Sequence, residues 1–243
     1  MIAVAVAGAA GRMGETVCAA VEGAGDMELV GRADPLLGTS LEEILMGTHP
    51  PTTGPTARLP EVVVDFTRPE TALGNALACV RAGVHVVIGT TGFDPAPLRQ
   101  AKPAAGKPKA NVLIAPNFAI GAVLMMRFAA EAARHMAKAE IIELHHDQKL
   151  DAPSGTAART AQLIAEATGG GSGPAQPGIP IHSVRLPGIV ANQEVIFGDV
   201  GQTLSIRHET IGRESFMPGV LLAIRRVGSL EQSPVVGLEQ LLF

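Results

Sequence analysis

The feature that most constrains the fold is an alternation of short apolar segments with helix-like segments in the first half of the chain. Uninterrupted apolar runs such as Ile2–Ala7 and Val84–Ile88 are typical of strands that are buried on both faces. The segments between such runs, including Arg12–Glu22 and Pro69–Ala82, have the pattern of helices. Since strands that alternate with helices form parallel sheets, the sequence predicts a doubly wound α/β domain.

The same pattern places the remaining elements of this half. We expect further strands at Glu28–Ala33, Glu61–Phe66 and Val112–Ala115, a helix at Pro95–Ala105, and a long loop over 35–60 with a helical turn near Leu41–Met46.

The pattern changes after Asn117, where longer segments begin. We expect helices at Ala119–Lys138, Ser154–Thr168 and Phe216–Val227, a strand at Glu140–His145, an irregular loop over 169–180, and strands at Ile181–Leu186, Gln193–Phe197 and Thr203–His208. The last three strands have no helix between them, so they are predicted to pair antiparallel. The result is an α+β domain with an open, mostly antiparallel sheet, whose exposed faces and edges subunit association can cover.

Composition removes several classes of function. The chain has no Tyr and no Trp among its 243 residues, so a tyrosine phenol cannot be the acid of any reaction. The net charge is −4, so the chain has no excess of basic residues to attract nucleic acid. The longest apolar stretch, Ala119–Met126, is too short to span a membrane. Cys18 and Cys79 both lie in helix-like stretches and are interpreted as buried free thiols. We expect a soluble protein of the cytoplasm, with neither nucleic acid nor membrane as a partner.

A glycine-rich turn follows the first strand and opens the first helix. It reads Gly8-Ala9-Ala10-Gly11-Arg12-Met13-Gly14, a GxxGxxG spacing that favours backbone contact with a pyrophosphate at a helix N-terminus. Asp34 ends the second strand, where a carboxylate accepts hydrogen bonds from a ribose diol, so a Rossmann-like dinucleotide site is predicted. The alternatives are a turn that only packs, and for Asp34 a turn residue before Pro35. The charge of Asp34 favours NADH at least as much as NADPH.

Two further loops follow strands of the same sheet. They are Gly89-Thr90-Thr91-Gly92 and Ala115-Pro116-Asn117-Phe118, whose small and polar residues permit close approach of a ligand. Each loop taken alone is equally compatible with a structural role.

The most informative stretch for chemistry is 143–156, which reads ELHHDQKLDAPSGT. His145 and His146 end a strand, and Lys149 follows within the same stretch. Histidine titrates near neutral pH and can donate a proton to a carbon or nitrogen. Ser154 is a plausible cap for the next helix, whose first turn, with its free backbone N–H groups, suits a carboxylate.

Three other interpretations of these residues are open. The two histidines can simply end the strand, and Lys149 can be a solvated surface lysine. A metal site with Asp147, His182 or His208 is disfavoured because no HxxxH-type spacing lies on one helix, so no metal is expected.

Together these motifs resemble the 4-hydroxy-tetrahydrodipicolinate reductase (dihydrodipicolinate reductase) family of diaminopimelate and lysine biosynthesis, and most closely its actinobacterial members. The resemblance is carried by the glycine-rich turn, VDFTRPE at 64–70, GTTGF at 89–93, APNF at 115–118 and the stretch 143–156. It implies reduction of a ring carbon of a small dicarboxylate, with loss of water, by NADH and/or NADPH. It also implies a homotetramer, a dinucleotide-binding domain of residues 1–117 and 217–243, and a substrate-binding and oligomerisation domain of residues 118–216.

The resemblance also implies a role for each candidate residue. Cofactor binding falls to Gly8, Ala9, Ala10, Gly11, Arg12, Met13, Asp34, Phe66, Gly89, Thr90, Thr91, Ala115, Pro116, Asn117 and Phe118. Proton transfer falls to His145 and Lys149, and substrate binding to His146, Ser154, Gly155 and Thr156. The alternatives are a non-catalytic NAD(P)-binding regulator and an amino-acid dehydrogenase, neither of which needs the tandem histidines beside the Ser-Gly-Thr turn.

Overall fold

The computed structural model describes residues 1–50, 52, 58–169 and 178–243, which fall into two compact units. Unit 1 comprises Met1–Phe118 and Phe216–Phe243, and unit 2 comprises Ala119–Ser215. No helix among the described residues has both the length and the apolar character needed to cross a membrane.

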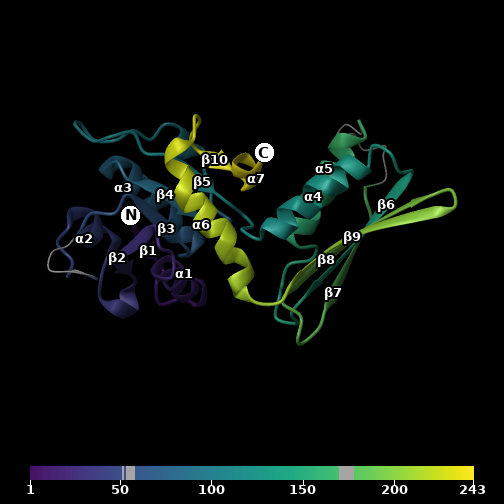
Figure 1. Ribbon diagram of the computed structural model, residues 1–243, viewed down its shortest axis with the longest axis horizontal. Helices are drawn as coiled ribbons and strands as arrows, with labels where there is room; N and C mark the ends of the chain where they lie inside the picture. The colour runs from purple at the N-terminus through teal and green to yellow at the C-terminus, as the bar shows by residue number, and fades with distance from the viewer. Residues whose placement is uncertain (51, 53–57, 170–177) are drawn as a thin grey trace. The chain divides into compact units, whose positions relative to one another are not determined.

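Unit 1 is built on a six-stranded parallel sheet in the order β10-β5-β4-β3-β1-β2 (Figure 1). Its strands are β1 (Ile2–Ala7), β2 (Met27–Ala33), β3 (Val62–Asp65), β4 (His85–Ile88), β5 (Val112–Ile114) and β10 (Val235–Val236). The chain order reverses between β1 and β3, which is the point where doubly wound sheets bind their ligands. The predicted fold class is therefore confirmed for this half.

Helices cover the sheet of unit 1. They are α1 (Arg12–Glu22), α2 (Leu41–Met46), α3 (Pro69–Ala82), α6 (Met217–Arg226) and the short C-terminal α7 (Glu239–Leu242). Side chains of α2 and α3 form one apolar cluster with alternate residues of the strands, and α1 and α6 contact each other. Strands β1, β3 and β4 are buried along nearly their whole length, as their unbroken apolar runs predict.

Unit 2 contains a four-stranded sheet in the order β7-β6-β8-β9. Its strands are β6 (Lys138–His145), β7 (Ile181–Arg185), β8 (Ala191–Asp199) and β9 (Gln202–Thr210). Two helices, α4 (Ile120–Ala132) and α5 (Gly155–Ala167), pack against each other and against one face of this sheet (Figure 1). Two of its three pairings are antiparallel, so the predicted α+β unit with a mostly antiparallel sheet is confirmed.

Three predictions about elements are wrong in detail. Residues 181–185 were expected to pair antiparallel with the two strands that follow, yet β7 pairs with β6 and runs parallel to it, because α5 connects the two strands as a crossover. The helix expected at Pro95–Ala105 is only a 3-10 turn, η2 (Ala96–Arg99), because Pro97 and Pro103 lack the N–H groups that a helix needs.

The third error concerns the helix expected at Ala119–Lys138. It ends at Ala132, and Lys138 already belongs to β6, where it pairs with Gly198. The pairing of β6 with β8 therefore outweighs the helical propensity of this segment. The short strand β10 was not anticipated at all.

Several local predictions agree with the structure. Helix α1 and the helical turn at Leu41–Met46 have the expected bounds, and Ser154 caps α5 by accepting a hydrogen bond from the Ala157 N–H at 3.2 Å. Cys18 and Cys79 are buried free thiols, and burial raises the pKa of Cys18 to about 11. The loops predicted at 35–60 and 169–180 fall partly on residues 51, 53–57 and 170–177, outside the described residues.

Candidate active site

The turn after β1 provides a backbone cradle in unit 1. Gly8 has φ +78°, and a Cβ on it would lie 2.8 Å from the carbonyl oxygen of Phe66 in the loop after β3. A Cβ on Gly14 would lie 2.0 Å from the Gly8 carbonyl oxygen, so helix α1 packs directly on the turn. Gly11 starts α1 without any side-chain cap, which leaves the N-terminal N–H groups available to an anion. This geometry fits the pyrophosphate of a dinucleotide.

Asp34 lies beside this turn at the end of β2. One of its carboxylate oxygens accepts a hydrogen bond from the Ala10 N–H at 3.1 Å, and the other accepts from the Leu36 N–H at 2.9 Å. Asp34 therefore acts as a turn residue before Pro35, as one of the alternatives predicts, and it also lies beside the glycine-rich turn. A carboxylate retains free lone pairs after two such bonds, so binding to a ribose diol is still possible.

The remaining candidate cofactor residues lie in loops at the carboxyl edge of the same sheet. The ring of Phe66 occupies the space beside Gly89, where a Cβ would lie 2.1 Å from its Cε1 atom. The rings of Phe66 and Phe118 are 5.7 Å apart between centroids. Thr90 donates a hydrogen bond from its hydroxyl to the Thr67 carbonyl at 2.9 Å, which joins the loops after β4 and β3. That these loops contact a nicotinamide stays a prediction.

In unit 2, His145 is the last residue of β6 and contacts a buried carboxylate. Its Nδ1 atom lies 2.5 Å from Oε2 of Glu143, whose side chain is 0 % exposed. Arg185 on the neighbouring strand donates two bonds to the same carboxylate, at 2.9 Å to Oε2 and 2.7 Å to Oε1. Burial alone would raise the pKa of Glu143, but hydrogen bonds from Arg185, Ser183 and His145 outweigh it and hold the pKa at about 2.

Lys149 lies in the loop after β6 and pairs with Asp151. Its Nζ atom donates to both carboxylate oxygens of Asp151, at 2.6 and 2.8 Å, and these bonds lower the pKa of Asp151. Burial, and the charges of Lys149 and Arg185, lower the pKa of His145, while Glu143 opposes this effect. The loop thus brings an ammonium group to the neighbourhood of His145.

The N-terminus of α5 completes this cluster. The Ser154 N–H donates to Oε1 of Glu143 at 3.3 Å, so the start of the helix is tied to the end of β6. Gly155 opens the helix, and a Cβ there would meet no atom within 4 Å, so the packing of the chain does not require glycine at this position. Thr156 follows in the first turn. A small residue in the first turn of a helix fits the approach of a carboxylate.

His146 directly follows His145, and its substrate-binding role stays a prediction. His146 is exposed and follows the end of β6, and its carbonyl accepts the Lys149 N–H at 3.2 Å. Within the described part of the chain, no group of three His, Cys, Asp or Glu side chains is arranged to hold a metal ion.

The sequence reasoning missed the roles of Glu143 and Arg185. Glu143 precedes His145 by two residues, so the alternation of side chains along a strand places both on the same face, and this signal was available. Arg185 could not be found in the same way, because its place beside His145 depends on the parallel pairing of β6 and β7.

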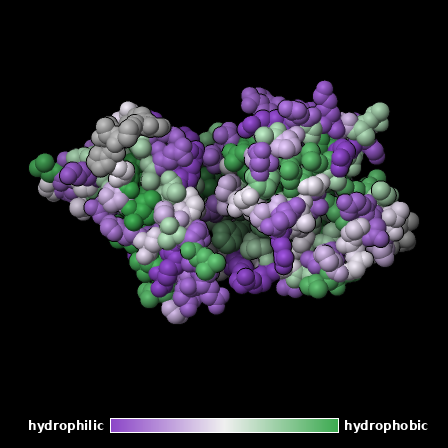
Figure 2. Space-filling view, turned by 180° about the vertical axis from the view of Figure 1, so that it is seen from behind, coloured by the Kyte–Doolittle hydropathy of each residue, from purple (hydrophilic) through white to green (hydrophobic). Residues whose placement is uncertain are grey.

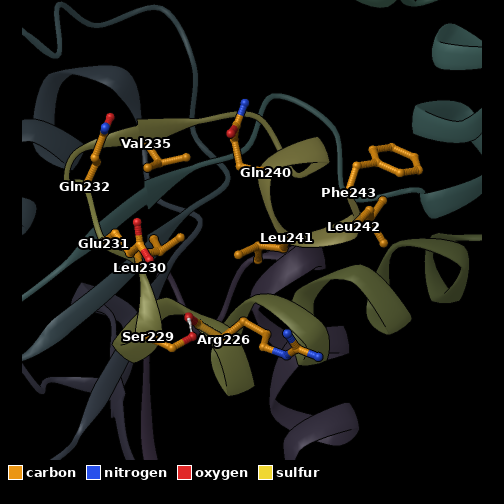
Figure 3. A pocket seen from close by; sticks show the side chains of 10 residues that line it. All are labelled: Arg226, Ser229, Leu230, Glu231, Gln232, Val235, Gln240, Leu241, Leu242 and Phe243. Atoms are coloured by element: carbon orange, nitrogen blue, oxygen red, sulfur yellow. Dashed lines mark hydrogen bonds between the residues drawn. The ribbon is translucent and has the colours of Figure 1, made fainter.

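A separate hollow of about 640 Å³ lies in unit 1, near the C-terminus. Figure 3 shows its lining from the end of α6, β10 and α7, with Arg226 and Glu231 as the charged members. The lining brings no cluster of titratable side chains together, which makes this hollow a weaker candidate for chemistry than the two sites above.

Comparison with known proteins identifies the family of the chain. Family models described as the N-terminus and the C-terminus of dihydrodipicolinate reductase match residues 2–118 and 121–242. The chain belongs to the dihydrodipicolinate reductase family. Two relatives named 4-hydroxy-tetrahydrodipicolinate reductase are similar over nearly the whole chain. The one from Nocardia farcinica is 49% identical with 93% of each chain covered, and that from Mycolicibacterium smegmatis is 48% identical with 98% of each covered.

A solved structure of this family has the same architecture. It is the dipicolinate-bound dihydrodipicolinate reductase from Paenisporosarcina sp. TG-14, with 41% identity, 99% of each chain covered and a TM-score of 0.79. The predicted family resemblance, including the likeness to actinobacterial members, is thereby confirmed.

Proposed function

We propose that this protein is a 4-hydroxy-tetrahydrodipicolinate reductase of diaminopimelate and lysine biosynthesis. It reduces 4-hydroxy-tetrahydrodipicolinate to tetrahydrodipicolinate with loss of water. The observation that carries the proposal is similarity to reductases of this name across both units, 49% identical in the relative from Nocardia farcinica. The cluster of His145, Glu143, Arg185 and Lys149 supplies the proton-transfer groups that such a reaction needs.

Unit 1 holds the dinucleotide in this proposal. Gly8–Met13 and the N-terminus of α1 bind the pyrophosphate, and Asp34 binds the adenosine ribose. The loops that contain Phe66, Gly89–Thr91 and Ala115–Phe118 hold the nicotinamide half. The cofactor, NADH or NADPH, supplies the hydride when it is bound.

Unit 2 binds the dicarboxylate and moves protons. His145 donates or accepts a proton, and Lys149 is a second proton donor. The first turn of α5, with Ser154, Gly155 and Thr156, and the exposed His146 bind substrate carboxylates, since the N-terminus of a helix favours anions and the His146 ring can donate a hydrogen bond. Support comes from the relative that was solved with dipicolinate, itself a small dicarboxylate. We further propose that the protein acts in the cytoplasm as a homotetramer.

A coupled assay tests the reaction. The upstream synthase, pyruvate and aspartate semialdehyde generate the substrate in place, and the loss of NADH absorbance reports its reduction. We expect consumption that requires both the synthase and this protein. An absorbance trace identical to that of the enzyme-free control would refute the proposed reaction.

Two variants test the assignment of the acid–base groups. His145→Gln and Lys149→Ala are each expected to lower kcat by about 10²- to 10⁴-fold, the usual contribution of a positioned acid or base. Binding of NADH, followed by its fluorescence, should stay near that of the wild type because neither residue lies in unit 1. If either variant kept the wild-type kcat, the role of that residue would have to be withdrawn.

A further inference from the structure

The hydrogen bond between His145 and Glu143 determines which ring nitrogen of His145 carries a proton. Nδ1 lies 2.5 Å from Oε2 of Glu143. A carboxylate with a pKa of about 2 is ionised near neutral pH and only accepts hydrogen bonds. Nδ1 must therefore carry hydrogen in both the neutral and the charged ring. This leaves Nε2 as the nitrogen that can lose and regain a proton.

Arg185 explains how the carboxylate of Glu143 keeps its charge at a fully buried position. It forms two bonds to the carboxylate, one to each oxygen, and the parallel register places Arg185 directly opposite His145. The same guanidinium donates a further bond, at 2.8 Å, to the carbonyl of Asp151. Asp151 in turn holds Lys149. One arginine thus connects the carboxylate behind His145 to the loop that carries Lys149.

We propose that Glu143 and Arg185 are positioning residues for the reaction. Glu143 holds His145 as the Nδ1–H tautomer, with Nε2 as the atom that exchanges a proton with the substrate. Arg185 holds both Glu143 and the Lys149 loop in place. This inference rests on the proposed function, in which His145 is the proton donor or acceptor.

The proton balance of the donor step follows from this arrangement. The Nε2–H bond of the charged ring breaks, an electron pair of the substrate forms the new bond to that proton, and the ring returns to the neutral Nδ1–H form. Glu143 keeps its charge throughout and takes up no proton, as the carboxylate of a Ser-His-Asp triad does.

The charges around His145 give the proposal a pH signature. Glu143 faces the ring from its own strand, Arg185 from β7 and Lys149 from the following loop, while the residue opposite on β8 is Ala191, which does not titrate. Glu143 is the group that favours the charged ring. Replacing Glu143 by Gln removes this charge and should lower the pKa of His145. In the plot of kcat against pH, the limb that reports His145 should therefore move to lower pH.

Nitrogen NMR of the wild-type protein tests the tautomer without turnover. With ¹⁵N-labelled histidine, and His145→Gln to assign the signals, we expect a protonated Nδ1 and an unprotonated Nε2 in the neutral ring. A neutral ring protonated at Nε2 would overturn the proposal. Because this measurement needs neither substrate nor activity, it decides the tautomer independently of the coupled assay, and it needs no variant at Glu143.

Kinetics test the consequence for catalysis. Glu143→Gln should lower kcat by about 10²- to 10⁴-fold with unchanged NADH affinity, and Glu143→Asp should recover part of the loss because it restores the charge. Glu131→Gln is the matched control, since Glu131 also lies between an arginine and a histidine, Arg134 and His135, but on an exposed helix end. This control should leave kcat unchanged. Wild-type kcat and an unmoved pH limb in Glu143→Gln would overturn the proposal.

The role of Arg185 is tested separately. Arg185→Lys keeps the charge but loses the two-pronged contact with Glu143 and the bond to the Asp151 carbonyl, so kcat should fall and KM for the dicarboxylate should rise. Arg134→Lys, at an exposed ion pair, is the control and should change neither. Wild-type kcat and KM in Arg185→Lys would exclude Arg185 from the proposal.

Discussion

Glu143 is a buried carboxylate whose charge several donors stabilise. Arg185, His145 and the Ser154 N–H all contact it, and none of its side chain is exposed. A buried charge without partners would be strongly destabilising, so these bonds are required for the fold as well as suited to chemistry. These bonds tie the end of β6, which carries His145, to β7 and to the start of α5.

The acid stability of the protein should therefore depend on Glu143. Its pKa falls from a usual value of 4.5 to about 2 on folding. A lowered pKa contributes stability that is present above pH 4.5 and is lost as the pH falls through 2, on the order of 3 kcal/mol. Urea unfolding at a series of pH values should show a steeper loss of stability below pH 4.5 in the wild type than in Glu143→Gln. Glu131→Gln should follow the wild type, and equal pH slopes in all three proteins would contradict this account.

Asp34 should set the choice of cofactor. Its charge at the end of β2 repels the 2′-phosphate of NADPH, and Arg32, one of the nearest cationic candidates, is paired with Glu22 at 2.7 Å. We expect kcat/KM for NADH to be at least equal to that for NADPH. Asp34→Asn keeps an acceptor for the turn but removes the charge, so the ratio should move toward NADPH.

Asp94→Asn is a suitable control for this measurement. Asp94 also precedes a proline and accepts a hydrogen bond from the N–H two residues on, Ala96, at 2.9 Å. The cofactor ratio should not change in this variant. A preference of the wild type for NADPH of about a hundredfold would show that Asp34 does not discriminate in this way.

At the scale of elements, the sequence predicts what local patterns determine. Buried parallel strands such as Val84–Ile88 and capped helices such as the one after Ser154 have strong local signals, and the structure confirms them. The partner of β7 and the end of α4 at Ala132 depend on which strands pair across the sheet, and no local pattern contains that information. Arg185 was not predicted for the same reason, because its position depends on the pairing of β6 with β7. His145 was proposed from the residues next to it in the sequence.

Helix α1 packs so closely on the glycine-rich turn that any side chain at position 14 should destabilise the protein. A Cβ would lie 2.0 Å from the Gly8 carbonyl oxygen and 2.8 Å from the Ala9 Cα, and neither backbone atom can move cheaply. Gly14→Ala should cost about 1–3 kcal/mol or more in denaturant unfolding and weaken NADH binding. Gly74→Ala in α3 meets nothing within 4 Å and should be neutral or stabilising by about 1 kcal/mol. Equal stabilities of the two variants would contradict the close approach.

At the scale of the whole molecule, the amino-acid composition determines whether NADH binding can be measured by fluorescence. The chain has neither Trp nor Tyr, so the fluorescence of bound NADH can be followed without energy transfer from tryptophan. The face drawn in Figure 2 mixes hydrophobic residues with hydrophilic ones, and the net charge is −4. The uncovered face of the sheet in unit 2 is where apolar side chains bear on the assembly of the molecule.

One face of that sheet is covered by α4 and α5, and the other carries isoleucines beside charged pairs such as Glu140–His182 and Glu194–Arg207. Ile141 and Val195 are buried under the helices, so the alternation of side chains turns Ile142 and Ile196 to the opposite face. A sheet face that no helix covers is buried by association with other copies in many oligomers. We therefore expect this face to form a contact in the proposed homotetramer.

Light scattering coupled to gel filtration tests this assembly. The wild type is expected to have the mass of four chains of 25.0 kDa each. Ile196→Lys replaces an apolar side chain of this face with a charge and should release smaller species, because an unpaired charge is costly to bury at an interface. Met46→Lys, at an exposed position of α2 in unit 1, should keep the wild-type mass. A monomeric wild type, or an Ile196→Lys variant of unchanged mass, would exclude this face of the sheet as the contact that holds the tetramer together.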